Sequence, residues 1–254
     1  MCIYNGRRVT RAQFIRLKET ERSLEALDEL DLPVQYGYDY QDWPILKPTA
    51  DKTGFDIIMA HWEFLPPRIE SSAALYQFRA SYDTLNARGE RLLTSSLFRA
   101  AALNGRCLIL SWGFYEYQHV QQTGKSGKVL KAPLKVPYHV TLPAQDYFFM
   151  AGISQQTVDC ESGETVETFA LVTTEANALM AQVHNSKNRM PVILPEELAA
   201  DWLLGELSPE QINRLATYQF PAAQMKAWPV KKDFRRSTEP TEPGVYENLP
   251  QLVL

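Results

Sequence analysis

The chain has 254 residues, of which 45% are hydrophobic and 22% are charged, with a formal net charge of −4. This size and composition allow a sizeable buried core and exclude an intrinsically disordered chain. No stretch approaches the ~20 consecutive apolar residues that span a bilayer, and arginines interrupt the N-terminal segment, which therefore does not match a signal peptide. We expect a cytoplasmic protein that does not associate with membranes.

The cysteines exclude two further classes of protein. Cys2, Cys107 and Cys160 are an odd number, widely spaced, with no CxxC pair and no histidine at metal-ligand spacing. They predict neither a disulfide framework nor a zinc site, and we expect no metal and no cofactor. Cys107 lies in the apolar run RCLIL and is predicted to be a buried small hydrophobe, whereas Cys160 falls in a polar hairpin turn.

The charge is less uniform along the chain than its sum indicates. Lys and Arg gather at 7–18, at 187–189 and at 231–236, and acidic residues concentrate at 19–31 and 239–247. Because phosphate binding depends on one local face, a basic groove on this acidic protein remains compatible with the sequence, as does scattered solvated charge.

In the N-terminal half the hydrophobic spacing predicts three elements separated by loops. Thr10 and Gln13 have capping-box spacing, and apolar residues then recur at helical intervals, so we expect an amphipathic helix over 11–30. A Pro-, Tyr- and Trp-rich stretch at 33–48 reads as irregular chain over the core. Residues 55–65 are expected to form a strand, and 90–104 a helix that ends at Asn104-Gly105.

Strands dominate the middle of the chain and helices follow. The expected strands are 106–117, 136–142, 147–154 and 167–174, with turn signals at 124–127 and 161–164. The expected helices are 174–184, one near 195–205, and one that starts at Ser208, which has capping-box spacing with Gln211. Without βαβ alternation, this pattern predicts an α+β fold, a single domain over 1–254 with a mixed or antiparallel, barrel-like sheet flanked by helices and an extended tail at 237–254.

Two residues stand out as candidates for chemistry. Cys2 follows the initiator methionine, so removal of Met1 gives it a free α-amine beside its thiol. Glu116 follows the apolar, aromatic run ILSWGFY, where burial raises the pKa of a carboxyl and makes it a usable general acid or base. A strand-end glutamate that faces water is the alternative interpretation of Glu116.

Two further stretches carry polar residues in loops. His184 ends a predicted helix, where a histidine is also favoured by the helix dipole alone. Asn86 lies in the tripeptide NAR, where asparagine commonly forms turns. Arg88 and Arg189 each carry a planar guanidinium that can clamp a phosphate or a carboxylate.

The order of these stretches is more specific than any one of them. Together they resemble the SRAP family, the SOS-response-associated peptidase fold of abasic-site processing proteins, from Cys2 to about residue 230. The stretches that carry the resemblance are Cys2, NAR (86–88), RCL followed by WGFYEY (106–117), KVPY (135–138), AGI (151–153), TTEAN (173–177) and His184 followed by RMPVIL (189–194).

The resemblance implies a single domain that reacts covalently with abasic sites in single-stranded DNA. A Schiff base at C1′ also permits β-elimination of the 3′ phosphate, so weak lyase activity is a further expectation. It implies Cys2 as the nucleophile, Asn86 as the residue that orients the terminus or the opened sugar, and Glu116 and His184 as proton carriers. The implied DNA-binding residues are Trp62 stacked near the lesion, Arg88 and Arg189 on phosphates, and Met190 and Pro191. We expect a monomer that is associated with the nucleoid when bound to DNA.

The chemistry of an N-terminal cysteine leads to the same reaction. An abasic sugar is partly a ring-opened aldehyde, and an α-amine with a reference pKa near ~8 is partly neutral at pH 7. The amine gives a Schiff base, and the neighbouring thiol of Cys2 then closes a five-membered thiazolidine. Single-stranded DNA suits this site, since aromatic stacking and arginine contacts need no groove.

The sequence departs from the family's pattern at several places. Cys2 is followed by Ile-Tyr-Asn where Gly-Arg is usual, and Trp62 is followed by Glu63-Phe64 where Gly-Leu is usual. Tyr117 follows Glu116 where tryptophan is usual. Four residues (185–188) separate His184 from Arg189, where one is typical, and one of them is a lysine.

Two other functions remain open at this stage. Cys2, Glu116 and His184 could form the catalytic set of a thiol peptidase that acts on its own N-terminus, as the family's name suggests. Alternatively, the chain could bind single-stranded or modified DNA without a covalent bond, in which case binding would depend on salt and would survive loss of Cys2.

Overall fold

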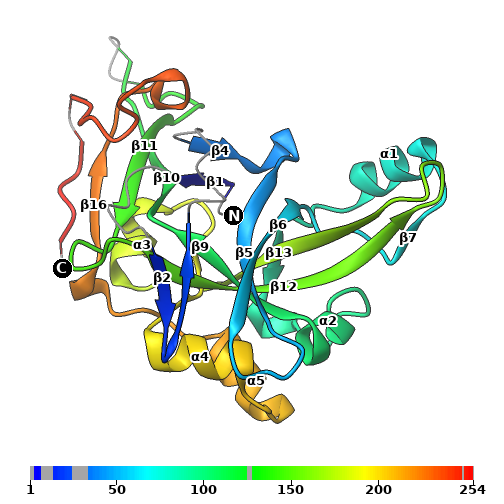
Figure 1. Cartoon of the computed structure of the whole chain (residues 1–254). Helices are drawn as coiled ribbons and strands as arrows, with labels where there is room; N and C mark the ends of the chain where they lie inside the picture. Colours follow the sequence, from blue (N-terminus) through cyan, green and yellow to red (C-terminus); the bar gives the residue numbers. More distant parts are fainter. Residues whose placement is uncertain (1–2, 7–13, 25–33, 125–127, 248, 254) are drawn as a thin grey trace.

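The strands of the described chain form two sheets and one separate hairpin (Figure 1). The computed structural model describes residues 3–6, 14–24, 34–124, 128–247 and 249–253. The smaller sheet is antiparallel throughout, and its strand order is β16 (Lys226–Pro229), β11 (Leu134–Thr141), β10 (Gly113–Val120), β1 (Tyr4–Gly6) and β4 (Val34–Tyr36).

The larger sheet closes on itself. Its order is β14 (Arg189–Pro191), β13 (Thr165–Glu175), β6 (Phe55–Trp62), β5 (Asp42–Pro48), β9 (Arg106–Ser111), β12 (Phe148–Asp159) and β15 (Ile193–Leu194). Because β12 also pairs with β13, the strands β13, β6, β5, β9 and β12 form a closed ring. Two short strands, β7 (Arg68–Ile69) and β8 (Asn86–Arg88), pair in parallel with β12 and β13. The α+β fold with a mixed, barrel-like sheet is therefore confirmed.

The helices lie around this barrel. α2 (Arg99–Asn104), α4 (Glu196–Leu204) and α5 (Pro209–Ala216) pack near one another against one side, and α3 (Ala178–Val183) contacts β10. α1 (Ser72–Ser81) lies with β7 on an arm formed by the far ends of β12 and β13, which projects from the body (Figure 1). In the part of the chain that is described, no helix combines the length and the apolar character that crossing a membrane requires.

Strand β9 is buried on both of its faces. Leu108 and Leu110 belong to the core cluster under α4 and α5, whereas Cys107 and Ile109 belong to the cluster between the barrel and the smaller sheet. This two-sided burial explains the unbroken apolar run RCLIL, which a strand with one solvated face would not need. Cys107 is fully buried, as predicted, and burial raises the pKa of its thiol to about 12.

The predicted helix over 11–30 is wrong for the residues that the structure describes. Residues 14–24 hold a hairpin of β2 (Phe14–Leu17) and β3 (Thr20–Ser23). Phe14 and Arg16 are exposed while Ile15 and Leu17 are buried, which is the period of two of a strand. The helical spacing counted Phe14 and Leu17 and passed over Ile15.

The prediction of irregular chain over 33–48 is wrong. This stretch supplies β4 and the barrel strand β5. The prolines misled the prediction because proline cannot donate a ladder hydrogen bond. β9 pairs with β5 only at Ile45 and Leu46, so Pro44 and Pro48 lie outside that doubly paired segment. The Trp43 indole donates a 2.9 Å hydrogen bond to the Leu110 carbonyl and anchors the strand.

Two other predicted elements are divided. The helix expected over 90–104 is helical only in the 3-10 turn Gly89–Arg91 and in α2, which does end at Asn104 as predicted. The strand expected over 106–117 is interrupted at Trp112, and its halves β9 and β10 belong to different sheets.

The remaining predictions are closer to the structure. Residues 55–65, 136–142, 147–154 and 167–174 overlap β6, β11, β12 and β13, and the turn at Cys160 joins the last two strands. The helices expected near 195–205 and after Ser208 are α4 and α5, and Ser208 forms the predicted capping box with Gln211. The helix expected over 174–184 is the shorter α3. The tail after 237 forms turns and an isolated bridge between Val230 and Pro243.

Candidate functional site

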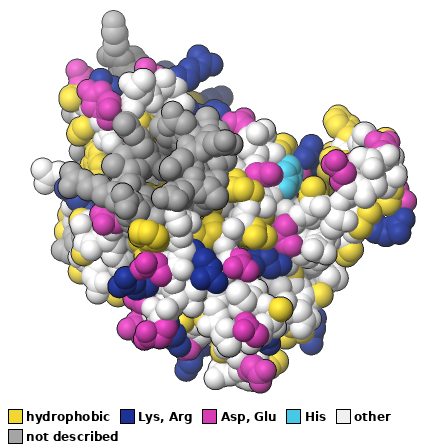
Figure 2. Space-filling view, viewed as in Figure 1, with side chains coloured by type: hydrophobic (Ala, Val, Ile, Leu, Met, Phe, Trp, Pro, Cys, Tyr) yellow, Lys and Arg dark blue, Asp and Glu magenta, His cyan; other side chains and the backbone are white. Residues whose placement is uncertain are grey.

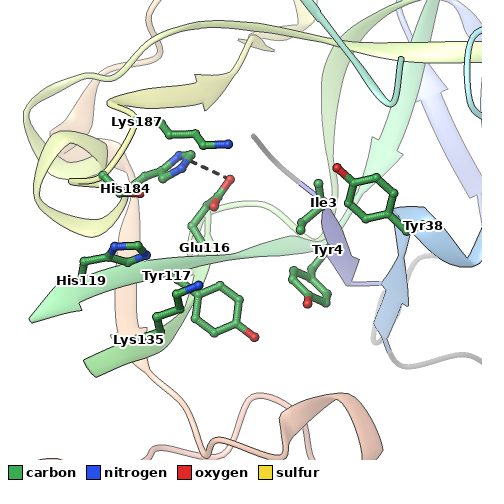
Figure 3. Close-up of a pocket in the computed structure, with 10 residues that line it drawn as sticks. Ile3, Tyr4, Tyr38, Glu116, Tyr117, His119, Lys135, His184 and Lys187 are labelled. Carbon is green, nitrogen blue, oxygen red and sulfur yellow. Dashed lines mark ion pairs between the residues drawn. The ribbon is translucent and has the colours of Figure 1, made fainter. Parts of the chain in front are cut away.

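Glu116 and His184 face a common cavity of about 440 Å³ (Figure 3). The cavity lies between β10, the loop after α3, and the chain that enters β1. In Figure 3 the Glu116 carboxylate points toward the His184 ring. The cavity is lined by Ile3, Tyr4, Tyr38, Glu116, Tyr117, His119, Lys135, His184, Ser186 and Lys187.

Strand β10 places Glu116 on a buried face. Its period of two puts Phe114 and Glu116 on one side, and Phe114 packs in the core between the two sheets. The Glu116 side chain is only 5% exposed, and its Oε1 has no hydrogen-bond partner among the described residues. Burial raises the pKa of Glu116 to about 8, so the carboxyl is protonated at neutral pH.

His184 follows α3 and is held by the backbone of the next strand. Its Nδ1 lies 2.9 Å from the Arg189 carbonyl oxygen. Because a carbonyl only accepts, this contact assigns the proton of a neutral ring to Nδ1 and leaves the lone pair on Nε2. Burial lowers the pKa of His184 to about 4 and keeps the ring neutral at pH 7.

The distance between Glu116 Oε1 and His184 Nδ1 is 3.6 Å, beyond a hydrogen bond. At neutral pH the pair therefore consists of an uncharged acid and an uncharged base in van der Waals contact. The cavity thus offers one group that can give a proton and one that can take it, without an internal ion pair to break first.

The predicted nucleophile lies next in sequence to this cavity. Ile3 is one of the lining residues and begins the described chain. Cys2, which precedes it, lies outside the described residues.

A second cavity of about 550 Å³ contains the other predicted polar residues. Asn86 and Arg88 reach it from β8, and Arg189 from β14. Asn86 is buried, and neither its Nδ2 nor its Oδ1 has a hydrogen-bond partner within the described part of the chain. A buried amide without a partner is costly, which favours a ligand that satisfies it. The cavity is lined by Asp83, Asn86, Arg88, Arg91, Ser95, Phe98, Thr173, Lys187 and Arg189.

Arg189 is already held by an acid that the sequence did not indicate. Its two terminal nitrogens donate to the two oxygens of Glu90 at 2.9 and 2.8 Å, and one of them also donates to the Thr173 carbonyl at 2.7 Å. Burial is the largest single influence on Glu90 and opposes its ionisation, but the hydrogen bonds from Arg189, Thr174 and the backbone, together with the charge of Arg189, lower the pKa of that carboxyl. Ninety-nine residues separate the two partners, so no local pattern reveals the pair.

Three residues of the predicted DNA-binding set lie in the core. Trp62 is 2% exposed, stacks on Phe169 with ring centroids 6.1 Å apart, and donates to the Leu85 carbonyl. Met190 and Pro191 are also buried in β14. Here the ring of Trp62 is not accessible to a DNA base, whereas Arg88 and Arg189 of the predicted set line the second cavity.

Lys187 lines both cavities and was not among the predicted site residues. It belongs to the stretch 185–188, whose extra length is visible in the sequence. Tyr38 also connects the two cavities, because it lines the first and its hydroxyl donates a 2.7 Å hydrogen bond to Asp83 in the second.

A third cavity of about 420 Å³ lies between the ends of β5, β6, β12 and β13 and is lined by none of the predicted site residues. No group of three or more metal-ligating side chains is found among the described residues. On the face seen in Figure 2, cationic and anionic side chains are mixed over the described surface.

Comparison with known proteins places this geometry in a family. The family model for SOS response associated peptidase (SRAP) matches residues 4–237. The chain is similar to the abasic site processing protein YoqW of Bacillus subtilis, with 27% identity over 169 residues, 66% of either chain, and to YedK of Escherichia coli, with 27% identity over 144 residues, 57% of this chain and 58% of that one. These matches span less than two thirds of each relative.

The fold is also found in a crystal structure. A protein from Bacteroides thetaiotaomicron superimposes with a TM-score of 0.75 and 26% identity, over 95% of this chain and 97% of that one. Since the family model covers nearly all of the sequence, the chain belongs to the SRAP family.

Proposed function

We propose that this chain processes abasic sites and that it captures them covalently in single-stranded DNA through a processed N-terminal Cys2. The observation that carries the proposal is the cavity in which Glu116 and His184 lie beside Ile3. Ile3 lines this cavity and directly follows Cys2 in the sequence. The names of the similar proteins, abasic site processing proteins, support the same substrate.

The reaction needs both nucleophiles of the terminal cysteine. The α-amine attacks C1′ of the ring-opened sugar and forms a carbinolamine, which loses its hydroxyl as water to give an imine. The thiol then adds across the C=N bond: sulfur bonds to C1′ and the thiol proton ends on nitrogen. One water is released overall, and the product is a thiazolidine.

Glu116 and His184 divide the proton transfers. The protonated Glu116 carboxyl donates to the ring oxygen of the sugar during ring opening, and the carboxylate takes back a proton from the C1′ hydroxyl as the aldehyde forms. The reprotonated carboxyl then donates to the departing hydroxyl of the carbinolamine. Nε2 of His184 accepts a proton from the amine as the carbinolamine forms. The 2.9 Å contact of Nδ1 with the Arg189 carbonyl keeps the ring in the tautomer that this role needs.

In this proposal the second cavity binds the opened sugar and the neighbouring backbone of the DNA strand. The unpartnered amide of Asn86 can both donate to and accept from the hydroxyls of the opened sugar. Arg88 contacts a backbone phosphate. Arg189 presents a guanidinium that Glu90 has already ordered. Trp62 has no role in this proposal.

The test is a crosslinking assay with and without Cys2. Protein with Met1 removed is mixed with a single-stranded oligonucleotide that carries one abasic site, and the products are measured by denaturing gel and intact mass. We expect a heat-stable adduct whose mass is the sum of the two components minus one water. Cys2→Ala removes the thiol and should form no such adduct.

Cys160→Ala is the matched control, because it removes a thiol in the turn between β12 and β13 that lines neither cavity, and it should crosslink like the parent. Equal crosslinking by Cys2→Ala would contradict the mechanism. Turnover of a peptide substrate without DNA would indicate a thiol peptidase instead. Salt-sensitive binding with no adduct would indicate a non-covalent DNA binder.

A further inference from the structure

The loop at residues 185–188 contains a lysine, Lys187, that lines both cavities. Lys187 is exposed. Figure 3 shows its side chain above the Glu116 carboxylate, with its amine end directed toward the side of the cavity where Ile3 and Tyr38 lie. No carboxylate within the described ranges forms an ion pair with it, in contrast to Arg189 and Glu90.

The loop is fastened at both ends. The Asn185 side chain accepts a 2.9 Å hydrogen bond from the His119 amide and donates a 3.0 Å bond to the His119 carbonyl, as a neighbouring strand would. The Asn188 amide donates to the His184 carbonyl at 2.9 Å, and its carbonyl accepts from Ala176 at 3.0 Å. Asn188 has φ +52°, a left-handed conformation that asparagine tolerates. The backbone position of Lys187 is therefore defined although its side chain is exposed.

The charges around the passage favour an anion. The second cavity is lined by four cationic side chains, those of Arg88, Arg91, Arg189 and Lys187, and one acid, Asp83. The ion pair with Glu90 balances the charge of Arg189, which leaves three cations against Asp83. Asp83 accepts from Tyr38. On the other side, Glu116 and His184 are uncharged at neutral pH. An ammonium is a compact charge with three donors and binds phosphate oxygens without a fixed approach direction.

We propose that Lys187 binds the phosphate that flanks the abasic nucleotide as the strand passes from one cavity to the other, with Asn185 as the residue that positions it. This inference rests on the proposed function and adds a contact to it. It makes Lys187 responsible for affinity near the lesion, whereas Cys2, Glu116 and His184 carry the reaction.

The test uses a lesion that binds but cannot react. A single-stranded oligonucleotide with a tetrahydrofuran residue has no aldehyde, so its affinity reports binding alone. We expect Lys187→Met to weaken binding roughly tenfold at low salt. We also expect the slope of log K against log salt to fall by about 0.7, the value for one phosphate contact in a single strand. Lys187→Arg keeps the charge and should bind like the parent.

Lys52→Met is the control, since Lys52 lies exposed in the β5–β6 turn and its ion-pair partner among the described residues is Glu206, at 4.0 Å. Placing a neutral methylphosphonate at each linkage beside the tetrahydrofuran locates the contact. With the methylphosphonate at one of these two linkages, Lys187→Met should no longer reduce the binding affinity.

Three outcomes would overturn this inference. The salt slope of Lys187→Met could equal that of the parent, Lys187→Arg could bind as weakly as Lys187→Met, or neither linkage could show the coupling. In each case a parent protein that still crosslinks a true abasic site leaves the proposed function standing. A parent that neither binds nor crosslinks refutes both.

Discussion

Glu116 and His184 have pKa values shifted in opposite directions by the same cause. Burial disfavours charge, so it raises the pKa of the carboxyl to about 8 and lowers that of the imidazole to about 4. In solution the order is reversed, with the carboxyl as the stronger acid. The acid–base assignment proposed above follows from this reversal.

The shifts also make folding stability depend on pH. Below pH 4.5, Glu116 is protonated in both states; between 4.5 and 8 only the folded state keeps the proton, so stability falls as pH rises. His184 acts oppositely between 4 and 6.5, where only the unfolded state is protonated and stability rises with pH. Above pH 6.5 only the contribution of Glu116 remains.

We therefore expect the parent to lose about 2 kcal/mol of unfolding free energy between pH 6.5 and 8 through Glu116. Glu116→Gln is neutral at every pH and should lack this loss. Urea unfolding of both proteins at the two pH values measures how much unfolding free energy each of them loses. Titratable groups that both proteins share contribute equally to the two losses, so they cancel in the comparison. Identical losses would mean that folded Glu116 is ionised at pH 7.

At the scale of elements, the site depends on how α3 is fixed to β10. Asn177 caps α3 by accepting from the Met180 amide at 2.9 Å, and its amide nitrogen donates to the Phe220 carbonyl at 2.6 Å. Beyond the helix, Asn185 pairs with the backbone of β10 at His119, three residues after Glu116. One strand therefore carries the acid and receives the loop that follows the base.

Asn185→Ala removes this connection and should slow capture of abasic DNA by about tenfold, with a loss of roughly 1 kcal/mol in unfolding free energy from the two exposed hydrogen bonds. Single-turnover crosslinking rates and urea unfolding measure the two effects. Asn104→Ala is the control, because Asn104 is also exposed and also donates to a backbone carbonyl, that of Ala100 at 3.2 Å. A rate for Asn185→Ala equal to that of Asn104→Ala would show that the loop needs no such tether.

At the scale of the whole molecule, the strands β11, β12 and β13 were predictable because apolar runs and turn residues are local signals. The predictions for residues 14–24 and 42–48 are wrong because strand pairing and core contacts with distant parts of the chain determine the secondary structure there. Ile15 and Leu17 enter a core formed by distant elements, and Pro44 is tolerated only where β9 is absent.

The site divides in the same way. Ordered motifs predict Glu116, His184 and Asn86 as site residues, and these residues line two cavities that share Lys187. The ion pair between Glu90 and Arg189, and the position of Lys187 on the wall of both cavities, depend on contacts between residues far apart in the sequence. The burial of Trp62 likewise depends on Phe169, more than a hundred residues away.

The position of Asn86 depends on a close approach across the molecule. A Cβ added at Gly89 would lie 1.8 Å from the Ala216 carbonyl oxygen at the end of α5. Gly89→Ala must therefore move β8 or α5, and we expect it to lower the unfolding free energy by about 3 kcal/mol. Gly163→Asn, in an open turn at φ +76°, should cost less than about 1 kcal/mol. Urea unfolding distinguishes them, and equal losses would contradict the clash.

Strand β1 begins two residues after Cys2, the proposed attachment point of the DNA, and it is hydrogen-bonded on both edges. Asn5 pairs with Phe114 of β10 on one side and with Gln35 of β4 on the other, and its side chain accepts from the Ser111 hydroxyl at 2.7 Å. A motor that pulls on captured DNA would load this strand along its axis. Both ladders would have to shear together, so the mechanical strength of the attachment would come from the middle of a sheet rather than from a loose terminus.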